Sequence, residues 1–106
     1  MAEPTTDVKQ RVHEYIGRLR ELIRLDRVYL FGSHAQGTAD DWSDIDLAVI
    51  SPDLGKSLLE DVRVLVAARS DATVGVSALP FSRRESEELP AGSFLREVIR
   101  KGQVVY

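Results

Sequence analysis

Two short apolar runs on either side of a polar segment restrict the fold of this chain more than any other feature. RVYLF (27–31) is rich in β-forming residues and stops at Gly32, and DIDLAVI (44–50) is followed by Ser51 and Pro52. Short runs of this kind, bounded by glycine or proline, are typical of buried strands. The sequence therefore predicts two strands that are joined by a polar loop and belong to one sheet.

The first half of the chain also predicts a long amphipathic helix. Apolar residues recur at three- and four-residue steps from about Asp7 to Leu25, and Thr6 or Asp7 is placed to cap the helix. The predicted buried face consists of Val8, Val12, Tyr15, Ile16, Leu19, Leu22 and Ile23. This helix precedes the first strand and can cover one side of the sheet.

The second half predicts further helices and two more strands. A helix over 56–68 has Leu58, Leu59, Val62, Leu65 and Val66 on one face, and TVGVSAL (73–79) predicts a third strand. Ser82 and Glu85 fit a capping box that begins a short helix. A last helix over about Ser93–Arg100 is expected to bury Phe94, Leu95, Val98 and Ile99, and VVY (104–106) can add a terminal strand. The element order predicts an α+β (α/β) fold, a small sheet flanked by helices.

Composition limits the classes of protein to which the chain can belong. Its 106 residues are too few for a second hydrophobic core, so 1–106 is expected to be a single domain. The net charge of −3 argues against direct binding of nucleic acid, which needs a clustered basic face. There is no cysteine and no apolar run long enough to span a membrane, which favours a cytoplasmic protein.

The loop after the first strand has glycines at the spacing of a phosphate-binding P-loop. Gly32 and Gly37 fit that spacing, but the lysine and hydroxyl residue that should follow are replaced by Thr38 and Ala39. The P-loop interpretation therefore fails. Gly32 still permits close approach of an anion, and Ser33 adds a hydroxyl beside backbone N–H groups. A plain turn between strand and loop is the alternative.

Two aspartates at the start of the second strand are the other candidate for chemistry. Side chains two residues apart on a strand point to the same face, so Asp44 and Asp46 are expected to lie about 6–7 Å apart. Two carboxylates at that distance repel by about 2–3 kcal/mol at an effective dielectric of about 20. Mg²⁺ would relieve the repulsion, because it prefers carboxylate oxygens and keeps places for water and phosphates. Two solvated aspartates at a strand end are the alternative.

Together the two segments form a more specific pattern than either alone. Gly32-Ser33, ten intervening residues and Asp44-Ile45-Asp46 give G-S-x10-D-x-D, with Ser43 before the pair. This pattern resembles the minimal nucleotidyltransferases (MNT) of the DNA polymerase β superfamily, and the resemblance extends over nearly the whole chain. It implies a mixed sheet flanked by helices, a nucleotide triphosphate held at Gly32, Ser33 and Ser43, and catalytic Asp44 and Asp46 that bind Mg²⁺.

One expected residue of that family is missing. The family usually has a third carboxylate on the next strand, which helps to hold the metal and to deprotonate the acceptor. The matching positions here are Gly75 or Ser77, and Asp71 precedes the predicted strand. The sequence therefore predicts a site with two carboxylates, whose activity is reduced, depends on a partner or is lost.

The resemblance also implies a partner. Single-domain members commonly pair with a small helical HEPN protein as antitoxin and toxin, and transfer AMP from ATP to a tyrosine of that toxin. The resemblance therefore implies an adenylyltransferase that acts on a protein partner, with ATP and Mg²⁺ as nucleotide and metal. The alternative is a binding module that has lost catalysis and neutralises its partner by contact. The nucleotide, the acceptor and the oligomeric state stay open.

Two other residues in the loop have competing interpretations. His34 can touch a phosphate, although a histidine in an exposed loop is more often incidental. Trp42 can stack on a base or pack under the loop, and tryptophan side chains are more often packed.

Overall fold

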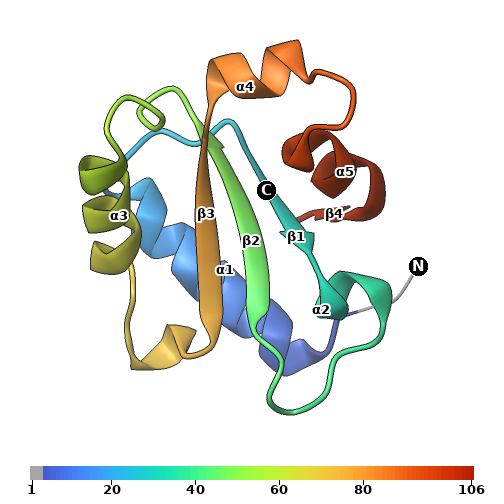
Figure 1. Ribbon diagram of the computed structural model, residues 1–106. Helices are drawn as coiled ribbons and strands as arrows, with labels where there is room; N and C mark the ends of the chain where they lie inside the picture. Colours follow the sequence, from blue (N-terminus) through green and yellow to red (C-terminus); the bar gives the residue numbers. More distant parts are fainter. Residues whose placement is uncertain (1–3) are drawn as a thin grey trace.

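A mixed sheet of four strands forms the centre of the protein. The computed structural model describes residues 4–106, and its strands are β1 Arg27–Phe31, β2 Ile45–Ser51, β3 Val76–Ser82 and β4 Gln103–Val104. They lie in the order β3-β2-β1-β4 (Figure 1). β1 is antiparallel to β2 and β4, and β2 is parallel to β3. The predicted small mixed sheet is thus confirmed, and β1 has the predicted bounds.

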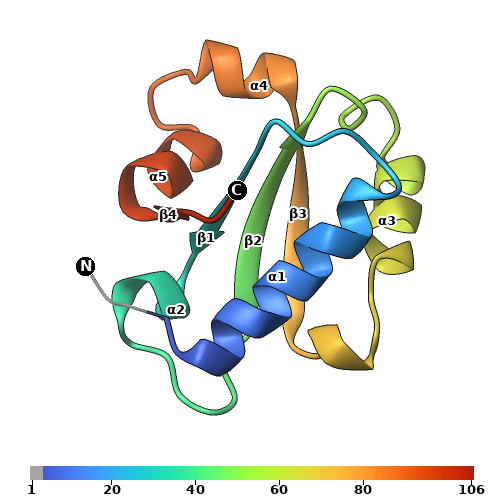
Figure 2. The same cartoon turned by 180° about the vertical axis from the view of Figure 1, so that it is seen from behind.

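Helices cover the sheet on both faces. They are α1 Thr6–Arg20, α2 Ser33–Gln36, α3 Leu58–Ala67, the 3₁₀ turn η1 Asp71–Thr73, α4 Arg83–Glu88 and α5 Phe94–Lys101. α1 crosses one face of the sheet with α3 beside it, as Figure 2 shows. α5 lies on the opposite face near β1 (Figure 1). Among residues 4–106 no helix is long and apolar enough to cross a membrane.

Each face of the sheet has its own apolar core. Tyr15 and Leu19 of α1 pack with Val28, Leu30 and Leu47 in the larger core. The Tyr15 hydroxyl donates a hydrogen bond of 2.7 Å to the Leu65 carbonyl, which joins α1 to α3. Burial raises the pKa of Tyr15 to about 12, so its phenol stays a donor at neutral pH. On the other face, Leu95 and Val98 of α5 pack on Ala48 and Ile50.

The first helix is shorter than predicted at its C-terminal end. Thr5 caps it, since its Oγ1 accepts the Val8 N–H at 3.2 Å, and the helix ends at Arg20 rather than at Leu25. The predicted face is buried from Val8 to Leu19, whereas Leu22 is 49% exposed. The Arg24 N–H donates to Asp53 instead of continuing the helix. The chain must turn here to reach β1, and this tertiary contact ends the helix.

The predicted buried face of α3 is wrong. Leu65 is buried, but Leu58, Leu59, Val62 and Val66 are all exposed. The helix instead turns Asp61 inward, where its Oδ2 accepts the Gly55 N–H at 3.0 Å. Asp61 is thus buried together with a hydrogen-bond partner, as a buried polar group requires, and the apolar side of the helix is left exposed.

The third strand begins and ends later than predicted. Residues 73–75 form the end of η1 and a turn in which Gly75 has φ +88°, a conformation that an alanine would strain. β3 then continues to Ser82 through Pro80. Pro80 lacks an N–H but is tolerated because β3 is an edge strand. The predicted capping box is confirmed, with Ser82 and Glu85 bonded reciprocally at 3.1 and 2.9 Å.

The last two elements follow the prediction closely. Ser93 caps α5, and Leu95 and Val98 are buried, but Phe94 is 54% exposed. β4 is confirmed as a terminal strand that begins at Gln103 rather than at Val104.

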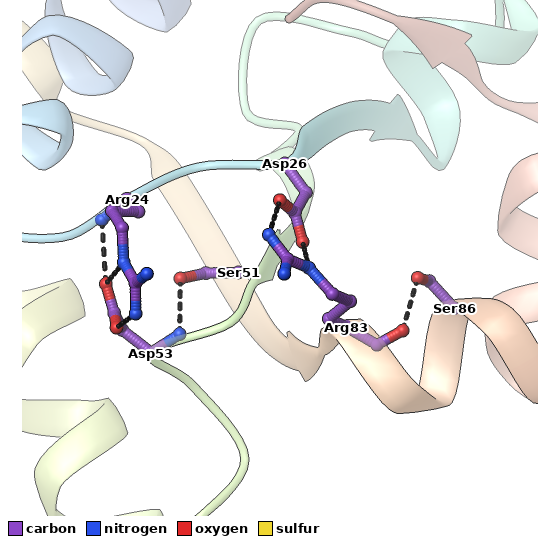
Figure 3. A network of polar contacts seen from close by, with 6 residues as sticks. All are labelled: Arg24, Asp26, Ser51, Asp53, Arg83 and Ser86. Carbon is purple, nitrogen blue, oxygen red and sulfur yellow. Dashed lines mark hydrogen bonds and ion pairs between the residues drawn. The ribbon is translucent and has the colours of Figure 1, made fainter.

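Ion pairs join the chain at the end of the sheet where β2 and β3 finish. Arg24 donates two side-chain hydrogen bonds of 2.6 and 3.2 Å to Asp53, and Arg83 donates two of 2.8 Å to Asp26 (Figure 3). The buried Ser51 accepts the Asp53 N–H at 2.9 Å. We call this region, made of Arg24, Asp26, Ser51, Asp53 and Arg83, the network end.

Candidate functional site

The opposite end of the sheet brings together the predicted site residues. β1 ends there, and β2 and β3 begin there (Figure 1). In the strand register Asp46 is paired with Phe31 on one side and with Ser77 on the other, so these side chains share a face. We call this region, made of Gly32, Ser33, Asp44, Asp46 and Ser77, the site end.

The backbone conformation of Gly32 favours glycine, and the Asp46 side chain lies close to it. Its φ of +75° and ψ of −154° lie in a region that other residues rarely adopt. A Cβ atom added at this position would also collide with Oδ2 of Asp46. The backbone after β1 therefore lies directly against the carboxylate of Asp46, which joins the two segments of the predicted motif.

Ser33 begins a short helix directly after that glycine. The N–H groups of Ala35 and Gln36 both donate to the Gly32 carbonyl at 3.1 Å, and Gly37 ends the helix with φ +80°. Ser33 is partly exposed, and Gly32 has no side chain that could cap the helix. The start of α2 is thus open to an anion approaching over Gly32.

The loop between α2 and β2 is held by local hydrogen bonds. The Ser43 hydroxyl accepts the Asp40 N–H at 3.0 Å and donates to Asp40 Oδ1 at 3.1 Å, while His34 Nε2 lies 3.2 Å from the Ser43 carbonyl. The Ser43 hydroxyl, predicted to bind nucleotide, is therefore bonded within its own turn. His34 has a positioning role that its sequence context did not indicate.

Trp42 lies on this turn and projects away from the protein. Its backbone N–H donates to Asp40 Oδ1 at 2.9 Å, but the residue as a whole is 92% exposed. The interpretation of packing under the loop is therefore wrong. The indole is free to contact a ligand or partner.

The two aspartates differ in exposure and have no pairing cation. Asp44 is exposed and Asp46 is partly buried, and neither forms an ion pair with a residue in 4–106. Burial, and then the charge of Asp44, raise the pKa of Asp46, while His34 acts in the opposite direction. The site end thus holds two neighbouring negative charges that disfavour each other, as predicted from their spacing.

These residues fit a divalent metal that is held by two protein ligands. The donors are hard carboxylate oxygens, and burial, followed by the charge of Asp44, disfavours the charged form of Asp46, which a bound cation would favour. Of the two positions at which the resemblance implies a third carboxylate, Gly75 and Ser77, it is Ser77 that pairs with Asp46 in the strand register. In the described part of the chain, no group of three or more His, Cys, Asp or Glu residues is placed to hold a metal ion. Water and substrate oxygens would have to complete the coordination.

Two grooves reach the site end from opposite sides. A groove of about 470 Å³ between α2 and α5 is lined by Phe31, Gly32, Gln36, Phe94, Glu97 and Lys101, among others. A second groove of about 420 Å³ on the β3 side is lined by Asp44, Arg69, Ser70, Thr73, Gly75 and Ser77, among others. No sequence motif pointed to Arg69 or Phe94, because only in the folded chain does Arg69 line a groove with Asp44, and Phe94 a groove with Gly32.

Comparisons with known proteins agree with the fold and identify the family. The profile of a family described as "Nucleotidyltransferase domain" matches residues 12–102. A Sulfolobus solfataricus protein that is provisionally assigned as a nucleotidyltransferase superposes with a TM-score of 0.65 at 15% identity, covering 100% of this chain and 91% of its own. One chain of a toxin–antitoxin structure with AMP-PNP superposes with a TM-score of 0.62 at 26% identity, covering 92% of this chain and 72% of its own. None of the curated proteins that were compared has a matching sequence.

Proposed function

Because this chain belongs to the nucleotidyltransferase domain family, we propose that it is a Mg²⁺-dependent enzyme that transfers AMP from ATP to a protein partner. The observation that carries the proposal is the close approach of Gly32 to the Asp46 carboxylate beside Asp44. This arrangement offers a backbone surface for phosphates and two metal ligands within one small region. Such a region suits phosphoryl chemistry, in which positioning and charge stabilisation supply most of the rate.

The nucleotide is proposed to lie in the groove between α2 and α5, which Gly32 lines. Gly32 and Ser33 would hold the triphosphate beside the carboxylate of Asp46. Phe31 and Phe94 form an aromatic wall, with their ring centroids 5.6 Å apart in an edge-to-face arrangement. The half-exposed Phe94 leaves apolar surface for a base, while Lys101 forms an ion pair of 3.6 Å with Glu97 of the same groove. ATP is the favoured nucleotide because the similar toxin–antitoxin chain was solved with AMP-PNP, an ATP analogue.

Asp44 and Asp46 would hold Mg²⁺ between the strand and the nucleotide. The bound metal would neutralise charge on the phosphates and leave places for their oxygens. His34 keeps the loop before Asp44 in place through the Ser43 carbonyl, so it orients the carboxylates without contacting the reacting atoms. The N–H groups at the start of α2 would add fixed positive dipoles on the phosphate side.

The acceptor is proposed to be a small helical HEPN protein that acts as a toxin. The support is the similarity to one chain of a toxin–antitoxin assembly. In this proposal the chain is the antitoxin and silences its toxin by adenylylation. A protein acceptor also agrees with the net charge of −3, which disfavours a polyanionic acceptor.

Radiolabel transfer tests this function directly. The protein is incubated with Mg²⁺, a candidate HEPN partner, and ATP labelled at either the α- or the γ-phosphate. We expect label on the partner from α-labelled ATP only, since nucleotidyl transfer releases the outer phosphates as pyrophosphate. The Asp44→Asn/Asp46→Asn double variant should lose the transfer by at least about a hundredfold.

A variant at the network end provides the matched control. Asp26→Asn removes a carboxylate of the same type from the other end of the sheet and should leave the transfer rate unchanged. Label from the γ-phosphate, or transfer that survives the double substitution, would refute adenylylation at this site.

A second candidate function is inhibition of the partner by contact alone. The observation in its favour is Ser77, which stands opposite Asp46 where a third carboxylate would complete the metal site. In that case the partner stays unlabelled and is inhibited equally by wild type and by the Asp44→Asn/Asp46→Asn variant. Inhibition that requires both ATP and the two aspartates would exclude the binding module.

A further inference from the structure

The groove on the β3 side of the aspartates has a chemistry different from that of the nucleotide groove. It has a volume of about 420 Å³ and is lined by Asp44, Arg69, Ser70, Gly75 and Ser77, with Thr73, Val74 and Val76. Arg69 is exposed and forms no ion pair with any residue in 4–106. The groove thus has an unpaired cation at one wall and the Asp44 carboxylate at the other.

The positions of the two grooves determine from which side an acceptor can approach. β2 lies between β1 and β3, so Gly32 and Ser77 flank Asp46 on opposite sides. Displacement at phosphorus requires the entering and leaving oxygens to be roughly in line. With the outer phosphates at Gly32, the entering hydroxyl must come from the side of Ser77, which is the side of the second groove.

The charges of this groove indicate which acceptor it suits. Ser77 is a neutral residue at the position where a carboxylate would complete the metal site, and Arg69 is a cation without a partner. An acceptor that brings its own carboxylate would pair with Arg69 and supply the missing acidic group. We propose that this groove is the acceptor subsite and that it takes a polypeptide hydroxyl with an aspartate or glutamate beside it. The proposal rests on the proposed function and specifies its substrate class.

The reaction balances without any further reactant. The acceptor oxygen forms a bond to the α-phosphorus of the nucleoside triphosphate. The bond from that phosphorus to the bridging oxygen breaks, and pyrophosphate leaves with the bonding electrons. The hydroxyl proton passes to the acceptor's own carboxylate and then to water.

Binding of model peptides tests the subsite without requiring turnover. The probe is a blocked peptide with a tyrosine between two aspartates, and its control has asparagines in their place. Each is titrated into isotope-labelled protein, alone and with Mg²⁺ and α,β-methylene-ATP, in which the scissile bond is blocked. We expect the acidic peptide to shift the amide resonances of Arg69, Ser70 and Ser77, and to bind about tenfold more tightly than the neutral one.

Two substitutions sharpen the result. Arg69→Gln should bring the affinities of the two peptides to within about twofold of each other, and the exposed position of Arg69 makes a folding defect unexpected. Ser77→Asp should weaken binding of the acidic peptide and tighten binding of Mn²⁺, measured by electron paramagnetic resonance without nucleotide. Ser77→Asn is the neutral control and should do neither.

The proposal and the proposed function can fail separately. If Mg²⁺ and α,β-methylene-ATP shift neither the Gly32 nor the Ser33 amide resonance, the proposed function is overturned. Equal affinity for both peptides, shifts outside the groove or no shift at all would overturn the acceptor subsite even with nucleotide bound. The acceptor subsite would also be overturned if the groove amides are shifted by a short single-stranded oligonucleotide with a free terminal hydroxyl and not by the acidic peptide.

Discussion

The two ends of the sheet use the same residue type in opposite ways. At the network end, Asp26 and Asp53 are each held by an arginine through a pair of side-chain hydrogen bonds (Figure 3). At the site end, Asp44 and Asp46 lie together without an ion pair to any described residue. The first arrangement stabilises the folded chain, whereas the second keeps charge available for a metal and a nucleotide.

The protonation equilibria show the same contrast. Hydrogen bonds from Arg24 lower the pKa of Asp53 to about 2, and the hydrogen bonds from Arg83 lower the pKa of Asp26. Burial and the neighbouring Asp44 raise the pKa of Asp46. Folding therefore favours the ionised carboxylate at one end and disfavours it at the other.

The largest expected effect comes from Gly32→Ala. It forces a Cβ against the Asp46 carboxylate and strains a backbone with φ +75°, which together should cost about 3 kcal/mol of unfolding free energy. Binding of Mg²⁺ with α,β-methylene-ATP should be lost. Urea denaturation and calorimetry measure the two effects.

Gly37→Ala is the matched control for that variant. Gly37 also has a positive φ, of +80°, but it lies at the C-terminal end of α2, whereas Gly32 precedes the helix next to Asp46. Its substitution should cost about 1–2 kcal/mol and leave nucleotide binding intact. Equal effects of the two substitutions on nucleotide affinity would mean that Gly32 has no special relation to the site.

A smaller effect is expected at the network end, from Asp26→Asn combined with Asp53→Asn. A carboxylate whose pKa is lowered by folding adds stability above its unfolded pKa and loses it as the pH falls through the folded pKa. For Asp53 that window runs from the ordinary value of 3.8 down to about 2. The double variant should therefore melt below wild type at pH 7, and the difference should shrink between those two values. Nucleotide affinity should not change.

The smallest effect, and one of opposite sign, is expected from Asp46→Asn. A carboxylate whose pKa is raised by folding favours the folded state at low pH and disfavours it once both states are ionised. Without metal, this variant should therefore be slightly more stable than wild type at pH 7, and the gain should vanish as the pH falls below the pKa of Asp46. Urea denaturation in the presence of a chelator measures it. A variant less stable than wild type at pH 7 would contradict the account of Asp46.

The sequence predicted those elements whose local signals agree with their tertiary surroundings. RVYLF ends at a glycine that the site requires, and the Ser82–Glu85 capping box depends only on neighbouring residues. The orientation of α3 could not be predicted, because Leu58, Leu59 and Val66 form an apolar stripe that is typical of a buried face, whereas the helix turns Asp61 inward to accept the Gly55 N–H.

The motif of the candidate site could be predicted from the sequence, but the residues that surround it could not. The spacing of Asp44 and Asp46 indicated their repulsion, and the charge of Asp44 is, after burial, the second cause of the raised pKa of Asp46. The tether from His34 to Ser43 and the groove beside Arg69 depend on how the chain folds back on itself. The alternating valines of TVGVSAL suggested a strand over 73–79. Gly75 has a positive φ, and β3 therefore begins only at Val76.

Calorimetric titration of α,β-methylene-ATP tests most directly the claim that the site end binds a metal–nucleotide complex. The wild type is titrated with Mg²⁺ and with a chelator, beside the Asp44→Asn/Asp46→Asn variant and the Asp26→Asn/Asp53→Asn variant. We expect binding only with Mg²⁺, loss of binding when the site-end carboxylates are replaced, and unchanged affinity when the network-end carboxylates are replaced. Nucleotide binding that persists without Mg²⁺, or that survives replacement of Asp44 and Asp46, would contradict the claim.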